Sequence, residues 1–155
     1  MPDMLVKLYD LPGYNDLIDG LREEGIIIRK ALPPEKYEVV GWVEDNFDKK
    51  WASECDVAIS NKPVSCYIAV YNKELLGFAC YDTTCKDFFG PTGVAESARG
   101  KGIGKALLLK CLHALKEMGY AYAIIGGAGP TGFYQKTCGA VVIEGSTPGI
   151  YKGML

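Results

Sequence analysis

The sequence contains a single histidine, His113, and no two of its cysteines stand in C-x-x-C spacing. A zinc site of mixed cysteine and histidine ligands needs several such residues at short, regular spacing. We therefore expect no bound metal. Residues 1–7 contain no apolar signal core, and no apolar run approaches the roughly 18 residues that a membrane-spanning helix needs. These absences predict a cytoplasmic protein with no membrane partner.

The sequence also lacks an excess of basic charge. It has 17 Lys and Arg against 19 Asp and Glu, which gives a formal net charge of −2. A nucleic-acid-binding domain of this size carries a dominant basic surface, so we expect no nucleic-acid partner. A chain of 155 residues, 48% of them hydrophobic, suits one globular domain with a sizeable core.

Six cysteines stand at positions 55, 66, 80, 85, 111 and 138. Several lie within apolar patterns, where a reduced cysteine behaves as a small hydrophobic residue. We expect all six to be free thiols. A cysteine nucleophile is a weak hypothesis, because the sequence offers no plausible histidine partner to activate it.

The most informative segment is R-G-K-G-I-G-K at residues 99–105, which precedes a leucine-rich run. Its three glycines permit backbone shapes in which several amide groups converge on one phosphate. A helix that begins near Gly102 adds its positive N-terminal end. We call residues 99–105 the cradle and predict that it binds a pyrophosphate, chiefly through its backbone. The alternative is a glycine-rich turn that binds nothing. The predicted contacts are Arg99, Gly100, Lys101, Gly102, Ile103, Gly104 and Lys105.

Two familiar glycine motifs do not fit the cradle. The dinucleotide fingerprint G-x-G-x-x-G needs a third glycine where Lys105 stands. The phosphate loop G-x-x-x-x-G-K-[ST] needs a hydroxyl residue where Ala106 stands. The pattern that does fit is R-x-x-G-x-G.

Periodicity and turn residues predict an α/β chain. The predicted strands are 26–29, 64–71, 74–81, 88–94, 120–125 and one that starts at 141, with a last turn and edge strand around 148–151. The predicted helices are one short helix within 1–24, then 34–47, 50–58, 102–118 and one that carries 133–136. Strand 88–94 is broken by two glycines and a proline, so we expect unpaired backbone groups near Thr92 and Val94 that bind an amide-bearing ligand. The alternative is a simple edge strand.

The order of these elements and two of the motifs resemble the GCN5-related N-acetyltransferase (GNAT) superfamily over about residues 26–155. The two motifs are R-x-x-G-x-G at Arg99, Gly102 and Gly104, and F-Y-Q-K at 133–136, which is similar to the family's F-Y-E-K. The resemblance implies a mixed, mostly antiparallel sheet, flanked by helices and splayed between its fourth and fifth strands. Acetyl-CoA is then expected in the cleft, with its pyrophosphate on the cradle, its pantetheine arm on Thr92 and Val94, and Phe133 beside it. Residues 25–155 would form the acetyltransferase domain, with residues 1–24 as an extension packed on it.

The expected chemistry is attack of an amine on a thioester. It needs a base for the amine, a donor for the oxyanion and an acid for the leaving thiolate. We predict that Tyr134 is the acid, because a phenol of pKa ~10 can donate to a thiolate whose thiol has a pKa of ~8.5. The alternative is that Tyr134 only packs under the cofactor. His113 is expected to be a solvated surface residue. No base is assigned among the acids near the cleft, which are Asp82, Asp87, Glu96 and Glu144.

The function predicted from the sequence is acetyl-CoA-dependent transfer to a primary amine by direct attack in a ternary complex. The acceptor is a small-molecule or peptide amine, and a homodimer is compatible with the sequence. One alternative is a non-catalytic acyl-CoA-binding module, and another is an interaction domain that docks through residues 1–24. The aromatic residues that either line the acceptor site or belong to the core are Phe47, Trp51, Tyr71 and Tyr151.

Overall fold

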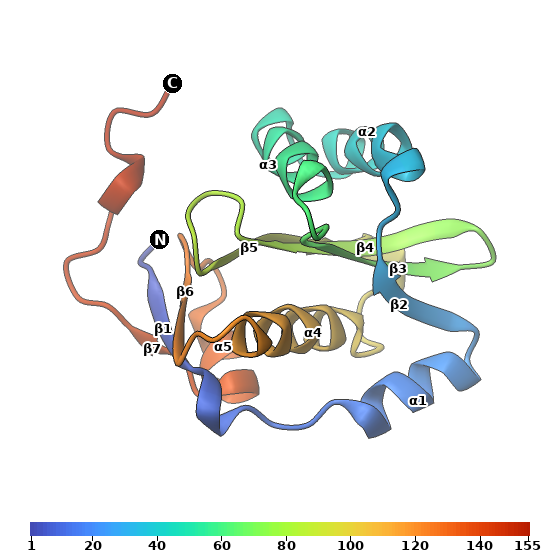
Figure 1. Cartoon of the computed structure of the whole chain (residues 1–155), viewed down its shortest axis with the longest axis horizontal. Helices are drawn as coiled ribbons and strands as arrows, with labels where there is room; N and C mark the ends of the chain where they lie inside the picture. The colour runs from blue at the N-terminus through green and yellow to red at the C-terminus, as the bar shows by residue number, and fades with distance from the viewer.

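Seven strands form one sheet in the computed structural model, which describes all residues from 1 to 155 (Figure 1). The order across the sheet is β2-β3-β4-β5-β6-β1-β7, and every neighbouring pair is antiparallel except β5 and β6. The strands are β1 Met4–Lys7, β2 Ile26–Lys30, β3 Cys66–Tyr71, β4 Glu74–Tyr81, β5 Phe88–Val94, β6 Tyr122–Ile125 and β7 Val141–Val142. The α-helices are α1 Asn15–Glu23, α2 Lys36–Asn46, α3 Lys49–Ser60, α4 Ile103–Glu117 and α5 Thr131–Cys138. The predicted mixed, mostly antiparallel sheet flanked by helices is confirmed.

Helices cover both faces of the sheet. Helices α2 and α3 lie over one face, and α4 lies against the other (Figure 1). Every third or fourth residue of α4 is apolar, and eight of its fifteen residues are buried. The α4 side holds a cluster of 24 buried residues, whereas the α2–α3 side holds a smaller cluster of 11. Both faces are therefore closed by apolar packing, and α4 is the central helix of the larger core.

The predicted tight hairpin between β3 and β4 is confirmed. Asn72 and Lys73 both have positive φ, at 47° and 65°. This pair of left-handed residues is the type I′ geometry, whose twist matches that of two antiparallel strands. A one-residue register shift between Ala69 and Val70 then places Cys66 opposite Cys80.

Residues 1–24 contain the predicted helix, α1, and also a strand that the sequence analysis missed. Strand β1 pairs with β6 on one side and β7 on the other. Met4 and Val6 point into the core and are completely buried. The amino-terminal segment therefore contributes an interior strand, next to the edge strand β7.

Two further expectations were wrong. Residues 149–151 form a short 3-10 helix and no edge strand, because Pro148 lacks a backbone donor and Gly149 takes a positive φ of 59°. His113 is half-buried rather than solvated, because its ring packs edge-on against Tyr14 and its Nε2 lies 2.9 Å from the Pro12 carbonyl oxygen. All six cysteines are free, as predicted. None of the helices combines the length and apolar character that a membrane crossing requires.

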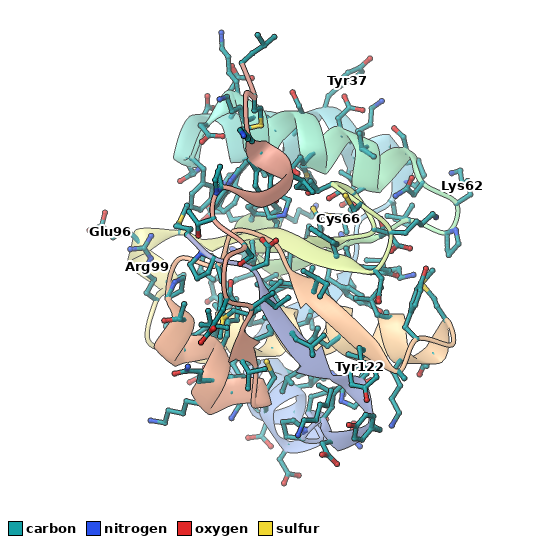
Figure 2. All side chains as sticks on the ribbon, turned by 90° about the vertical axis from the view of Figure 1, so that its left-hand side faces the viewer. Tyr37, Lys62, Cys66, Glu96, Arg99 and Tyr122 are labelled. Carbon is teal, nitrogen blue, oxygen red and sulfur yellow. The ribbon has the colours of Figure 1, made fainter.

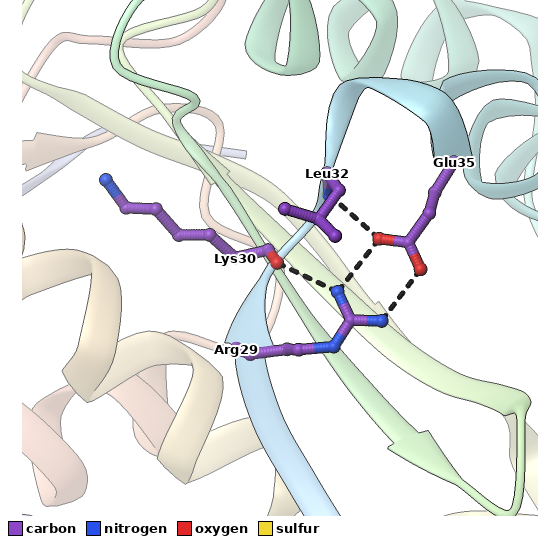
Figure 3. Close-up of polar contacts among 4 residues, drawn as sticks. All are labelled: Arg29, Lys30, Leu32 and Glu35. Carbon is purple, nitrogen blue, oxygen red and sulfur yellow. Dashed lines mark hydrogen bonds and ion pairs between the residues drawn. The ribbon is translucent and has the colours of Figure 1, made fainter.

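A bidentate ion pair connects β2 to the turn that precedes α2 (Figure 3). Arg29 donates to both carboxylate oxygens of Glu35, at 2.8 and 2.7 Å. Glu35 also accepts the Leu32 amide at 2.8 Å, and Arg29 donates to the Lys30 carbonyl oxygen. The hydrogen bond from Arg29 lowers the pKa of Glu35. Every charge in this cluster has a partner inside the molecule.

Candidate functional site

Strands β5 and β6 separate partway along their length. They pair only through Phe88 with Ile124 and Phe89 with Ile125. The last contact between them is the bond from the Gly126 amide to the Phe89 carbonyl oxygen, at 3.4 Å. Residues 90–94 then have no partner on the β6 side, although β4 pairs with residues 92–94 on the other side. The predicted splay between these two strands is confirmed, and the edge-strand alternative is wrong.

The backbone of β5 presents polar groups to this gap. The Ala95 amide donates to the Leu76 carbonyl oxygen at 2.7 Å, and bonded pairs alternate along an antiparallel ladder. Gly93 therefore bonds to β4, while the main-chain groups of Thr92 and Val94 face away from β4. The Thr92 hydroxyl is already bonded to the Phe78 carbonyl oxygen, and the Val94 carbonyl oxygen accepts from Arg99 Nε at 3.3 Å. The Val94 amide and the Thr92 backbone remain directed at the gap, and their ligand contacts stay a prediction.

The cradle follows β5 after one short 3-10 turn, Glu96–Ala98. Gly100 and Gly102 have φ of 85° and 88°, a left-handed conformation that glycine adopts without strain. A Cβ at Gly100 would have no atom within 4 Å, so the turn is open. Gly102 is the N-cap of α4, and the first backbone N–H groups of a helix have no partner within it. The free amides near Gly104 are therefore available to an anion.

The side chains of the cradle divide into two kinds. Lys101 and Lys105 are exposed, and neither of them nor Arg99 belongs to any ion pair of the structure. Arg99 lies at the surface near the short turn that carries Glu96 (Figure 2). Ile103 is instead buried in the core, with 1% of its surface exposed, so only its backbone is available to a ligand. The three cations remain uncompensated.

Helix α5 places Tyr134 beside the point where the strands part. Its ring packs edge-on against Phe89, the last residue of β5 that pairs with β6, and the ring centroids are 6.2 Å apart. Tyr134 is 5% exposed, whereas the neighbouring Phe133 is 39% exposed. Burial raises the pKa of Tyr134 to about 12, so the phenol keeps its proton at neutral pH. The predicted role of Tyr134 as an acid and the predicted contact of Phe133 with a cofactor stay predictions.

Three polar residues, Tyr151, Thr84 and Glu54, lie close together beside Gly126, although they come from segments far apart in the sequence. Tyr151 lies over Gly126, where a Cβ would be 2.8 Å from the tyrosine Oη. The Thr84 hydroxyl donates to the Glu54 carboxylate of α3. Burial raises the pKa of Glu54, and burial followed by the charge of Glu54 raises the pKa of Tyr151. The sequence analysis missed Glu54 and Thr84, because no local motif marks either residue.

The aromatic candidates for the acceptor site separate into two groups. Phe47 packs on Gly93, where any Cβ would collide with its ring, and Trp51 lies 5.1 Å from Phe47 between ring centroids. These two rings cover the α3 side of β5. Tyr71 lies at the hairpin end of β3 and packs on Gly25, so the structure does not bring it to this group.

The acids named as unassigned bases also fall in different places. Asp82 Oδ1 accepts the Asp87 amide at 2.7 Å in the turn before β5. Burial, then the neighbouring Asp82 carboxylate, raises the pKa of Asp87 to about 6, and Asp87 Oδ1 is buried without a hydrogen-bond partner. Glu96 lies in the turn before the cradle, and Glu144 is exposed. None of the four approaches the Glu54 cluster as an ion-pair or hydrogen-bond partner.

The sequence from 27 to 140 matches the family described as the Acetyltransferase (GNAT) family. The chain belongs to the GNAT family. The predicted resemblance is thereby confirmed over most of the chain, and members of this family are acetyltransferases. A search of curated proteins gave no match.

Solved structures of GNAT proteins share the fold. A GCN5-related glucosamine N-acetyltransferase region of a fungal multi-domain GH3 β-N-acetylglucosaminidase matches 92% of this chain with a TM-score of 0.74 and 16% identity. A GCN5-related N-acetyltransferase from Sphaerobacter thermophilus matches 92% with a TM-score of 0.70 and 21% identity. The matches span 19% and 48% of those chains. A GNAT acetyltransferase from Brucella melitensis, solved with acetyl-CoA, matches 72% of this chain and 80% of its own, with a TM-score of 0.57 and 22% identity.

Proposed function

We propose that this GNAT protein is an acetyl-CoA-dependent N-acetyltransferase that acetylates a primary amine by direct attack in a ternary complex. The observation that carries this proposal is the continuous polar path along β5. It starts where β5 and β6 part at Phe89, continues past the main-chain groups of Thr92 and Val94, and ends at the cradle. The path therefore connects the proposed reaction site near Phe89 to the anion site in the cradle through β5 and the turn that follows it.

The residues present fit the donor that the family implies. Acetyl-CoA supplies an activated thioester and a pyrophosphate. The open turn at Gly100, the free helix amides and the three uncompensated cations of the cradle suit the pyrophosphate. The free edge of Thr92 and Val94 suits the amides of a pantetheine arm, and the exposed ring of Phe133 offers apolar contact.

Two groups serve proton transfer in this proposal, Tyr134 on α5 and Glu54 on α3. Tyr134 keeps its proton because burial raises its pKa to about 12. That value exceeds the pKa of a thiol, ~8.5, so Tyr134 acts by hydrogen-bond donation to the leaving sulfur more than by complete proton transfer. Glu54 takes up the proton of the acceptor ammonium, since a carboxylate with a raised pKa accepts protons nearer neutral pH. Tyr151 lies over Gly126, and burial followed by the nearby negative charge of Glu54 raises its pKa.

A screen of amines tests the function. The full chain is incubated with acetyl-CoA and with amino sugars, amino acids, polyamines or peptides with free N-termini, and released thiol is measured. We expect at least one amine to give saturable thiol release. Release no faster than acetyl-CoA hydrolysis for every amine, with CoA binding intact, would indicate a non-catalytic binding module instead.

The substitution Tyr134→Phe tests the assigned acid. We expect kcat to fall about a hundredfold, with CoA affinity changed by less than about twofold, because the hydroxyl acts on the leaving sulfur and the ring is kept. Tyr37→Phe is the matched control, since Tyr37 is exposed on α2 (Figure 2). Unchanged turnover in Tyr134→Phe would leave this residue only a packing role.

A further inference from the structure

Three of the six cysteines meet in the core under α3. Cys55 lies on α3, Cys66 on β3 and Cys80 on β4, and none of the three is exposed. Their sulfur atoms all lie within 4.8 Å of one another. Cys66 lies in the layer between the sheet and the helices above it (Figure 2). We call these residues the thiol triad. The mechanism above does not use it.

The spacing of the thiol triad suits one ion with three sulfur ligands. A metal–sulfur bond of about 2.3 Å in a trigonal arrangement separates the sulfur atoms by about 4.0 Å. The group contains no histidine or carboxylate as a fourth ligand, and complete burial excludes solvent as one. Tetrahedral zinc, which needs a fourth ligand, therefore does not fit.

Charge then selects the kind of ion. The triad lies in an apolar cluster of 11 buried residues that includes no basic residue. Three thiolates around a monovalent ion leave two negative charges uncompensated, and around a divalent ion they leave one. Burying such a charge without a partner is strongly unfavourable. A trivalent centre with three thiolates is neutral.

We propose that the thiol triad binds a trivalent thiophilic metalloid, with arsenous acid as the representative ligand. Three As–O bonds break and three As–S bonds form, while arsenic stays in the +3 state. Each departing hydroxide leaves as water with one thiol proton. The neutral ligand and three thiols thus give a neutral complex and three waters, with no oxidant or reductant.

Native mass spectrometry of the full, reduced chain with sodium arsenite tests the site. We expect one arsenic per chain, with a mass that corresponds to loss of three protons, and a raised thermal midpoint. Because the site is closed, the incubation is repeated with refolding from denaturant in arsenite. The absence of an adduct under both conditions would overturn the proposal, as would an adduct that has lost only two protons.

Matched variants locate the binding. Cys66→Ala and Cys80→Ala should each lose the three-proton adduct, whereas Cys111→Ala should retain it, because Cys111 is also fully buried but outside the triad. If the triad variants do not fold, the wild-type proton count and the Cys111 variant still decide the question. Retention of the adduct in folded Cys80→Ala would contradict the assignment. Tighter binding of Zn(II) or Cu(I) at the triad than of arsenite would contradict the charge argument.

Discussion

The Arg29–Glu35 pair and the cradle use positive charge in opposite ways. Arg29 has every partner it needs inside the molecule, with two bonds to Glu35 and one to the Lys30 carbonyl oxygen (Figure 3). The cradle carries Arg99, Lys101 and Lys105 with no ion pair among them. The difference teaches that a compensated charge holds two elements together, whereas uncompensated charge beside an open turn and free amides is available to a ligand.

The largest effect should come from Gly102→Asp in the cradle. A side chain at φ 88° strains the turn, its Cβ would lie 2.9 Å from Leu17 Cδ1, and its carboxylate adds negative charge beside the helix amides of the cradle. We expect CoA affinity to fall at least about a hundredfold, measured by calorimetric titration. Gly119→Asp is the matched control, because Gly119 also has a positive φ, 104°, but follows the opposite end of α4. Equal affinity in the two variants would contradict the assignment of the cradle.

Glu54→Gln probes a carboxylate that, unlike Glu35, has no cation as a partner. We expect turnover to fall at least about tenfold with CoA binding unchanged. The wild-type rate should rise with pH through the raised pKa of Glu54, because only the ionised form accepts a proton. The variant should lose that limb of the pH profile. If the rate of Glu54→Gln still rises over the same pH range, the titration belongs to another group.

The double substitution of Lys101 and Lys105 by alanine should weaken CoA binding about tenfold at low salt. The difference should shrink as salt rises, because exposed charges are screened. The control is Lys62→Ala with Lys116→Ala, which removes two exposed lysines that belong to no ion pair. Lys62 lies on the other side of the molecule from Arg99 (Figure 2), and Lys116 lies in the last turn of α4. Equal losses of CoA affinity in both double variants would show that the cradle lysines act only through the overall charge of the protein.

The smallest effect should come from Glu35→Gln. Loss of the ion pair should cost about 1 kcal/mol of unfolding free energy, since both partners are partly exposed. Because the pKa of Glu35 is lowered in the folded state, this stabilisation is present above the unfolded pKa of about 4.3 and is lost as pH falls through the folded value. Urea unfolding of wild type and variant at pH 7 and in acid measures it. A change in CoA affinity would contradict a purely structural role.

The sequence predicted the parts of the site that local residues determine. Glycines at 100 and 102 permit the left-handed turn, and Asn72 with Lys73 sets the hairpin. The splay was predicted through resemblance to the family, supported by the glycines and proline of β5. These features depend on a few neighbouring residues, so a single sequence reveals them.

The features that were missed depend on contacts between distant segments. Strand β1 has only four residues, and its burial depends on β6 and β7. Glu54 meets Thr84 across the α2–α3 side of the sheet, and the thiol triad combines a helix with two strands. No spacing within the chain marks such a cluster.

Amide NMR of the 15N-labelled chain with CoA tests the central claim most directly. Pyrophosphate held by the cradle should give the largest shifts at the amides of residues 100–105, with smaller shifts at Thr92 and Val94. The amides around Arg29 and Glu35 should stay unchanged. Saturable shifts of this pattern are the predicted result. Absence of shifts at saturating CoA, or shifts centred away from the cradle, would contradict the assignment of this turn as the cofactor site.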